Sequence, residues 1–127
     1  MIDFVVWGTP RSHSAKSRPH WQGQVKAAVP PKVELLSGPL RLRIDFFFRG
    51  QTDLDTDNII KPIQDALEKV IYDNDKTIVD VCSRKIDLHR LPPTTNAPAS
   101  LLSALAMPPR EFVLIRVAGA HRSLSFT

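Results

Sequence analysis

In the centre of the sequence, the spacing of apolar residues changes from that of a strand to that of a helix and back. This pattern restricts the possible folds more than any other feature of the sequence. Residues 40–48 alternate between apolar and charged before ending in three phenylalanines, which predicts a strand covered on both faces at that end. Apolar positions then follow helical spacing over residues 59–70, and residues 78–89 alternate again. Because Pro62 fits only near a first turn, the helix should begin close to residue 59, with Asp57 or Asn58 as its N-cap.

The flanking segments extend this strand–helix–strand core. Residues 2–7 predict a first strand, residues 21–29 a short helix and residues 111–117 a last strand. Residues 91–110 hold five of the 11 prolines and predict an irregular excursion with about two helical turns. We therefore expect one α+β domain over residues 1–127, in β-α-β-α-β-β order, with one mixed sheet and two helices on it.

Charge is distributed unevenly along the 127 residues. The net charge is +4, but residues 53–80 carry eight acids and three bases, net −5. The remainder carries 14 bases and five acids, net +9. A basic body predicts a polyanionic partner, and the acidic segment inside it requires a separate explanation.

Several protein classes are excluded. No apolar run approaches the roughly 18 residues of a membrane span. The single cysteine, Cys82, excludes an intrachain disulfide and a cysteine-based zinc site. The first residues show no basic region followed by an apolar stretch, so no secretory signal is visible. With its single cysteine, the chain is expected to work in a reducing, cytoplasmic setting.

The acidic segment contains two clusters of aspartates. Asp53, Asp55 and Asp57 alternate, and in an extended backbone their side chains would point to one side. Asp73 and Asp75 follow the helix, and they join the first cluster only if the next strand runs back beside that helix. Clustered carboxylates repel one another unless a cation neutralises them, and oxygen ligands favour Mg²⁺, Mn²⁺ or Ca²⁺.

Lys61 lies four residues after Asp57 and therefore on the same helical face, beside this candidate metal site. Its ammonium would stabilise charge on a phosphate or help to polarise an attacking water. Simpler roles stay open for each residue. Asp57 would only cap the helix, Lys61 would only pair with Asp65, and Asp73 would be an ordinary turn residue.

A specific motif over residues 53–80 resembles a known enzyme family. The segment reads Asp55-Thr-Asp57-Asn58-Ile-Ile-Lys61-Pro62-Ile-Gln-Asp65-Ala66-Leu67, and Ile71-Tyr72-Asp73-Asn74-Asp75 and a strand follow it. About nine matched positions at fixed spacing resemble the RusA family of Holliday-junction resolvases, and they are far more specific than an Asp-x-Asp pair alone.

The resemblance implies a small homodimeric α+β endonuclease, encoded by a bacterium or phage and associated with the nucleoid. Such enzymes cut four-way DNA junctions with Mg²⁺, for which Mn²⁺ is a possible substitute, in DNA recombination and repair. By position, Asp55, Asp57 and Asp75 would bind the metal, Lys61 would be the catalytic lysine and Asp73 an auxiliary ligand. The family often has two adjacent aspartates in this turn, where this chain has Asn before Asp75.

Basic residues outside the motif are candidates for DNA binding. The loop between the first strand and helix carries Arg11, Lys16 and Arg18, which fit phosphate contacts unless the loop is merely solvated. Residues on the predicted strands would extend this surface: Arg41, Arg43, Arg84 and Lys85. Trp7 and Trp21 are predicted to lie in the core rather than to stack on bases.

Two other functions stay open on the sequence. The first is a non-catalytic module of the same fold that binds junctions or other DNA, against which the intact aspartates and lysine argue. The second is a metal-dependent nucleotide phosphohydrolase, which the extensive basic charge disfavours. Strong salt dependence of binding would favour DNA over a nucleotide.

Overall fold

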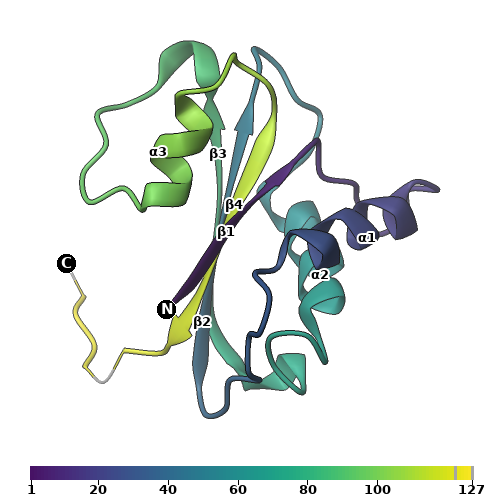
Figure 1. Cartoon of the computed structure of the whole chain (residues 1–127), viewed down its shortest axis with the longest axis vertical. Coiled ribbons are helices and arrows are strands. Elements are labelled where there is room, and N and C mark those ends of the chain that lie inside the picture. Colours follow the sequence, from purple (N-terminus) through teal and green to yellow (C-terminus); the bar gives the residue numbers. More distant parts are fainter. Residues whose placement is uncertain (122, 127) are drawn as a thin grey trace.

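Four strands form one mixed sheet in the order β1-β4-β2-β3. The computed structural model describes residues 1–121 and 123–126. β2 pairs parallel to β3, whereas β4 pairs antiparallel to both β1 and β2 (Figure 1). The α+β class and the mixed sheet are thus confirmed. The strands are β1 (Ile2–Trp7), β2 (Leu40–Phe48), β3 (Ile78–Asp87) and β4 (Phe112–Gly119).

Helices cover the two faces of the sheet unequally. α1 (Arg18–Ala28) and α2 (Thr56–Leu67) lie side by side on one face, which we call the helix face. α3 (Ala99–Leu105) is the short helix of the proline-rich excursion and covers part of the opposite face (Figure 1). It supplies the helical turns expected there, as a third helix beside the two expected on the sheet.

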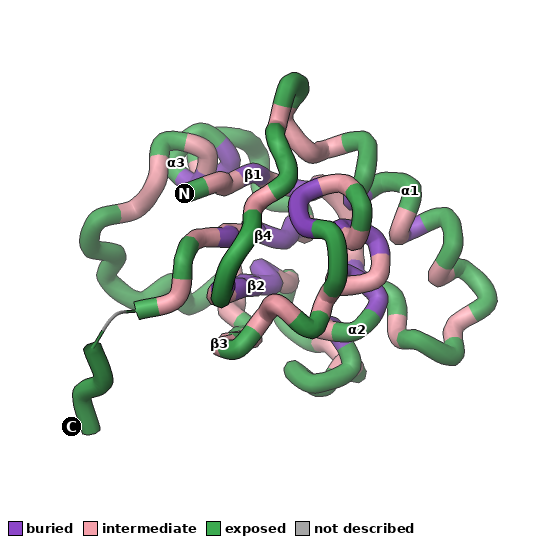
Figure 2. The backbone as a smooth tube through the Cα atoms, turned by 90° about the horizontal axis from the view of Figure 1, so that it is seen from below, coloured by how far each residue is buried: buried purple, intermediate pink, exposed green. Residues whose placement is uncertain are grey.

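The three phenylalanines that end β2 explain how both faces are packed. Phe46 points to the helix face and is fully buried in the main core with residues of α1 and α2. Phe47 points the other way, is 3% exposed and stacks on Phe112 in a smaller core under α3. The predicted coverage of this strand end on both faces is confirmed. Buried residues are concentrated in the central strands β2 and β4 (Figure 2).

Both long helices begin earlier than the sequence predicts. α1 starts at Arg18 because Pro19 is tolerated in a first turn, where its missing N–H costs nothing. α2 starts at Thr56 with Asp55 as its N-cap, so the expected start near residue 59 and the N-cap at position 57 or 58 are wrong. Pro62 lies inside α2 and has no N–H to donate. The first turn of α2 is also contacted from β3, where Oγ of Ser83 donates to the carbonyl oxygen of Thr56.

The two tryptophans differ in their surroundings. Trp21 is 1% exposed and belongs to the main core, as predicted. Trp7 is half-buried and packs on Phe112, with the two ring centroids 5.2 Å apart. The Arg110 guanidinium lies over the Trp7 ring, 4.4 Å from its centroid. In the described part of the chain, no helix is long and apolar enough to cross a membrane.

Candidate active site

Lys61 lies at the centre of a charged cluster on α2. Its Nζ is 2.9 Å from Oδ1 of Asp65 and 2.9 Å from Oδ2 of Asp75. Asp65 is one helical turn away, whereas Asp75 is 14 residues away, in a 3₁₀ turn, η1 (Asp75–Thr77), that leads into β3. The chain after α2 therefore folds back onto the helix, which is the condition that the sequence set for the two acidic clusters to approach each other.

Contacts around the acidic turn hold Asp75 in place. Its backbone N–H donates to Oε1 of Glu68 at 3.2 Å, and the buried Tyr72 hydroxyl donates to the carbonyl oxygen of Gln64 at 2.7 Å. Sequence reasoning did not identify Glu68 as a site residue. Its position seven residues after Lys61 was the available signal, because that spacing places it on the same helical face.

The ion pairs of Lys61 fix its protonation state. Hydrogen bonds first to Asp65 and then to Asp75 raise the pKa of Lys61 above its ordinary value of 10.5. Both partners stabilise the charged form, so the side chain stays an ammonium at neutral pH. Lys61 can therefore donate hydrogen bonds and stabilise negative charge, but it cannot accept a proton from water.

Asp55 and Asp57 lie at the N-terminal end of α2. Asp55 is the N-cap residue, but its side chain makes no capping hydrogen bond, and Asp57 lies in the first turn. Both residues are exposed, and among the described residues neither carboxylate makes a hydrogen bond or an ion pair. The capping role considered for Asp57 is therefore wrong. Both carboxylates lie at the positive end of the helix dipole and are free to bind a ligand.

These donors match the chemistry of a hard divalent cation, although the structure does not assemble them into a closed site. Three aspartate carboxylates supply the oxygen ligands that Mg²⁺ prefers. Within residues 1–121 and 123–126, however, no three acidic, histidine or cysteine side chains are already placed to hold one ion. Lys61 instead neutralises Asp75.

Asp73 lies apart from this cluster. Its carboxylate pairs with Nζ of Lys69 at 2.5 Å, and both side chains are largely exposed. Among the described residues, no salt bridge joins this pair to Lys61 or Asp75. The structure thus favours the turn role for Asp73 over the auxiliary role.

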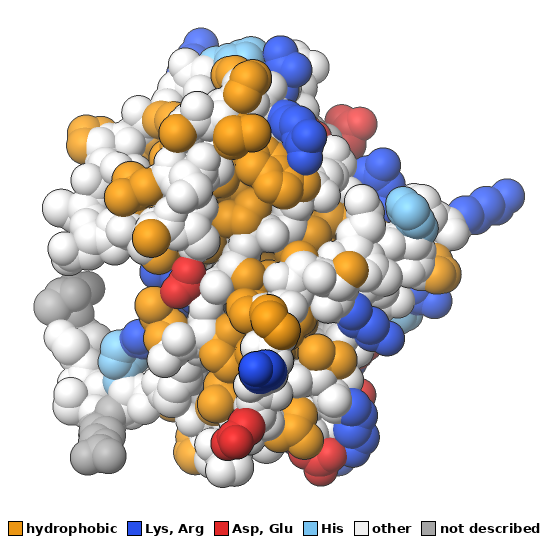
Figure 3. Space-filling view, in the orientation of Figure 1, with side chains coloured by type: hydrophobic (Ala, Val, Ile, Leu, Met, Phe, Trp, Pro, Cys, Tyr) orange, Lys and Arg blue, Asp and Glu red, His pale blue; other side chains and the backbone are white. Residues whose placement is uncertain are grey.

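The basic loop before α1 lies on the helix side of the molecule. α1 packs beside α2, and Nε2 of Gln22 donates to the carbonyl oxygen of Pro62 at 3.0 Å. Arg11 and Arg18 donate to carbonyls within the loop, and Lys16 is exposed. Figure 3 shows Lys and Arg side chains gathered along the edge formed by α1 and this loop.

Three of the other DNA-binding candidates lie on the opposite face of the sheet. Arg43 makes two 2.9 Å hydrogen bonds to Asp80, and Arg41 contacts the ring of His121. Nε of Arg84 donates to Asp45 at 2.6 Å. Because residues alternate between faces along a strand, these side chains point away from α2 and from Lys61.

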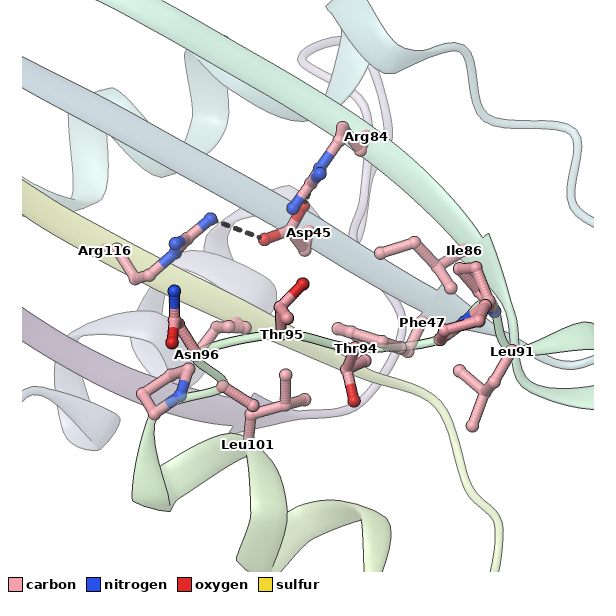
Figure 4. Close-up of a pocket in the computed structure, with 15 residues that line it drawn as sticks. Asp45, Phe47, Arg84, Ile86, Leu91, Thr94, Thr95, Asn96, Leu101 and Arg116 are labelled. Carbon is pink, nitrogen blue, oxygen red and sulfur yellow. Dashed lines mark hydrogen bonds and ion pairs between the residues drawn. The ribbon is translucent and has the colours of Figure 1, made fainter.

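Asp45 is a charged residue whose role the sequence did not reveal. It is 2% exposed and lies between Arg84 of β3 and Arg116 of β4, as Figure 4 shows. Nη2 of Arg116 donates to its second carboxylate oxygen at 3.2 Å. These residues form the polar end of a cavity of about 240 Å³ beneath the proline-rich segment.

Lys85, the remaining candidate, faces α2. Its Nζ donates to the carbonyl oxygen of Leu54 at 2.8 Å, immediately before Asp55. The structure therefore separates it from Arg84, its neighbour in sequence, and places it beside the candidate carboxylates.

Comparison with known proteins agrees with this arrangement. A family model described as endodeoxyribonuclease RusA matches residues 5–94, a span that includes the motif on α2, the acidic turn and β3. Comparison with curated proteins gives no match. The matched span covers most of the chain, and the resemblance that the motif predicted is confirmed: this chain belongs to the RusA family of endodeoxyribonucleases.

Proposed function

We propose that this protein is a Mg²⁺-dependent structure-specific endonuclease that resolves four-way DNA junctions by paired phosphodiester hydrolysis, in DNA recombination and repair. The supporting observation is the contact between Lys61 and Asp75 beside two carboxylates without partners, all within a family-specific motif. Endodeoxyribonuclease chemistry is what the family name describes.

Asp55, Asp57 and Asp75 are the residues that would hold the metal, with Mn²⁺ as a possible substitute for Mg²⁺. A bound divalent ion lowers the pKa of water and neutralises charge on a phosphate. Asp55 and Asp57 are available without breaking any contact, whereas Asp75 would share its carboxylate between the metal and Lys61, which contacts Oδ2.

Lys61 stabilises the phosphate on which the reaction takes place. Its ammonium has three N–H donors, of which Asp65 and Asp75 accept two. The third is free to donate to a phosphate oxygen as negative charge develops there. Asp65 keeps the ammonium in position through a contact along the same helix, whichever way Asp75 turns.

DNA binding involves the basic loop on the helix side. Arg11, Lys16 and Arg18 contact phosphates and position the junction without reading its sequence. Arg43 and Arg84 are already paired with carboxylates on the opposite face, which makes them poorer phosphate ligands near the cut. A homodimer would present two active sites related by a two-fold axis, which matches the symmetry of a four-way junction.

The test is incubation of the purified protein with a synthetic four-way junction and with a linear duplex of the same sequence. We expect paired nicks in the junction that require Mg²⁺ or Mn²⁺, and little cleavage of the duplex. Binding of the junction without any metal-dependent nicking would contradict the proposal and favour a non-catalytic binding module.

A further inference from the structure

We propose that Ser83 and Lys85 of β3 are positioning residues, which fix the backbone at Asp55 and Asp57, two of the three carboxylates that would hold a metal. This inference rests on the proposed function, because it takes these three carboxylates as the metal ligands. It reassigns Lys85 from DNA contact to support of the active site.

Each of the two side chains holds the peptide group that precedes one aspartate. Oγ of Ser83 donates to the carbonyl oxygen of Thr56 at 2.8 Å, and this carbonyl shares a peptide unit with the N–H of Asp57. Nζ of Lys85 donates to the carbonyl oxygen of Leu54 at 2.8 Å, and that carbonyl shares a peptide unit with the N–H of Asp55. Ser83 and Lys85 are two residues apart on the strand, and so are the two aspartates whose preceding peptide groups they contact.

The strand that supplies these donors is paired along one edge with the buried strand β2. Ser83 lies opposite Ile44, and Lys85 lies opposite Phe46, in the parallel register of β3 with β2. Both partners are fully buried in the main core. Because the partners cannot move without disrupting the core, the backbone that carries Ser83 and Lys85 has little freedom.

The third carboxylate lies just before the same strand. β3 begins at Ile78, directly after the η1 turn that opens with Asp75. The turn that opens with Asp75 therefore leads directly into the strand whose far half contacts the backbone before Asp55 and Asp57. The loop between Phe48 and Thr56 contains no helix or strand. Ser83 and Lys85 therefore restrict a segment whose conformation regular secondary structure does not fix.

The positioning role differs in its consequences from a DNA-binding role. The Lys85 ammonium already donates to Leu54, and that contact adds no affinity for phosphate. Groups that orient metal ligands typically affect metal affinity by about 10- to 100-fold when removed. A lysine that contacts one phosphate would instead reduce the slope of log K against log salt by about one unit.

The experiment measures binding of Mn²⁺ alone, by electron paramagnetic resonance, to the full-length protein and its variants. We expect Ser83→Ala and Lys85→Met each to weaken Mn²⁺ binding by about tenfold, while Ser83→Thr, which keeps the hydroxyl, restores it. Cys82→Ala is the matched control, because it alters the same strand on the opposite face. Hydrogen exchange should be faster at residues 54–58 in Ser83→Ala, and the salt dependence of junction binding should stay unchanged in Lys85→Met.

The outcomes separate the two proposals. If the wild type binds Mn²⁺ and cuts junctions while Ser83→Ala and Lys85→Met bind Mn²⁺ as tightly as the wild type does, the positioning role is wrong and the proposed function stands. A wild type that binds no Mn²⁺ and cuts no junction contradicts both. Should Ser83→Ala unfold, the Mn²⁺ binding of Lys85→Met decides the question. A reduced salt slope in that variant would restore Lys85 as a DNA contact.

Discussion

The two faces of the sheet use the same kinds of charged residue in opposite ways. On the face opposite α2, Asp45 is buried and paired with two arginines, and Asp80 accepts two hydrogen bonds from Arg43. At the start of α2, Asp55 is exposed, and its side chain makes no capping bond to the helix. Satisfied carboxylates stabilise the fold, whereas carboxylates without partners are available for chemistry.

Removal of one carboxylate at the start of α2 should have the largest effect on function. We expect Asp57→Asn to reduce junction cleavage by at least about a thousandfold, or roughly 4 kcal/mol of barrier. Junction binding should persist or tighten, because a negative charge facing phosphates is lost. A single-turnover cleavage assay beside a gel-shift titration measures both effects.

Asp53→Asn is the matched control for this variant. Asp53 lies in the loop that precedes α2 and is exposed, and it comes before the segment from Asp55 to Leu67 that carries the resemblance. It should cut at nearly the wild-type rate. Cleavage retained in Asp57→Asn would show that the site has been assigned to the wrong carboxylates.

Removal of the buried carboxylate on the opposite face should affect stability rather than chemistry. Asp45→Asn leaves Arg84 and Arg116 without their shared counter-charge, and both arginines are partly exposed, so we expect a loss of about 2 kcal/mol. Urea unfolding measures this difference, and the cleavage rate of the folded fraction should stay at the wild-type value. Undiminished stability would show that the two ion pairs of Asp45 contribute nothing to stability.

The salt dependence of junction binding should distinguish the basic residues of the two faces. We expect Lys16→Gln to reduce the slope of log K against log salt by about 0.9, as loss of one phosphate contact does. Arg84→Gln should leave the slope unchanged, because its guanidinium is occupied by Asp45. Equal reductions in the two variants would place DNA on both faces.

The smallest expected effect is a dependence of stability on acid pH. Hydrogen bonds from Arg43 lower the pKa of the Asp80 carboxyl below its ordinary value of 3.8. Since the folded-state pKa is the lower one, the stabilisation is present above about pH 4 and is lost as pH falls through that folded-state value. Thermal unfolding of the wild type and Asp80→Asn should therefore converge below pH 4, and a constant difference would exclude this pair as the cause.

The sequence predicted elements with a strong local pattern. The alternation before the three phenylalanines located β2, and the motif identified the family and the Lys61–Asp65 pair. The start of α2 was mispredicted because Pro62 appeared to require a nearby first turn. Contacts from Ser83 and Lys85, 27 and 31 residues away, stabilise an earlier start.

The sequence could not reveal which charges pair across the sheet. Asp45 appears in the alternating pattern as a solvent-facing residue beside Arg43, yet it is buried between two other strands. Its partners come from β3 and β4, and strand order is a property of the whole fold. The same reason separates Arg84 from Lys85, which are adjacent in sequence but face opposite layers.

The assignment of chemistry to the helix face and of stabilising ion pairs to the opposite face is tested most directly by removing one cationic side chain from each face. Lys61→Met and Arg84→Met should be compared in single-turnover cleavage of a four-way junction, with Mg²⁺ and protein in excess. We expect the rate of Lys61→Met to fall by about 100-fold, as loss of one donor to a developing negative charge does, and that of Arg84→Met to stay within about threefold of the wild type. An unchanged rate in Lys61→Met, or an equal loss in both variants, would contradict the assignment of the chemistry to the helix face.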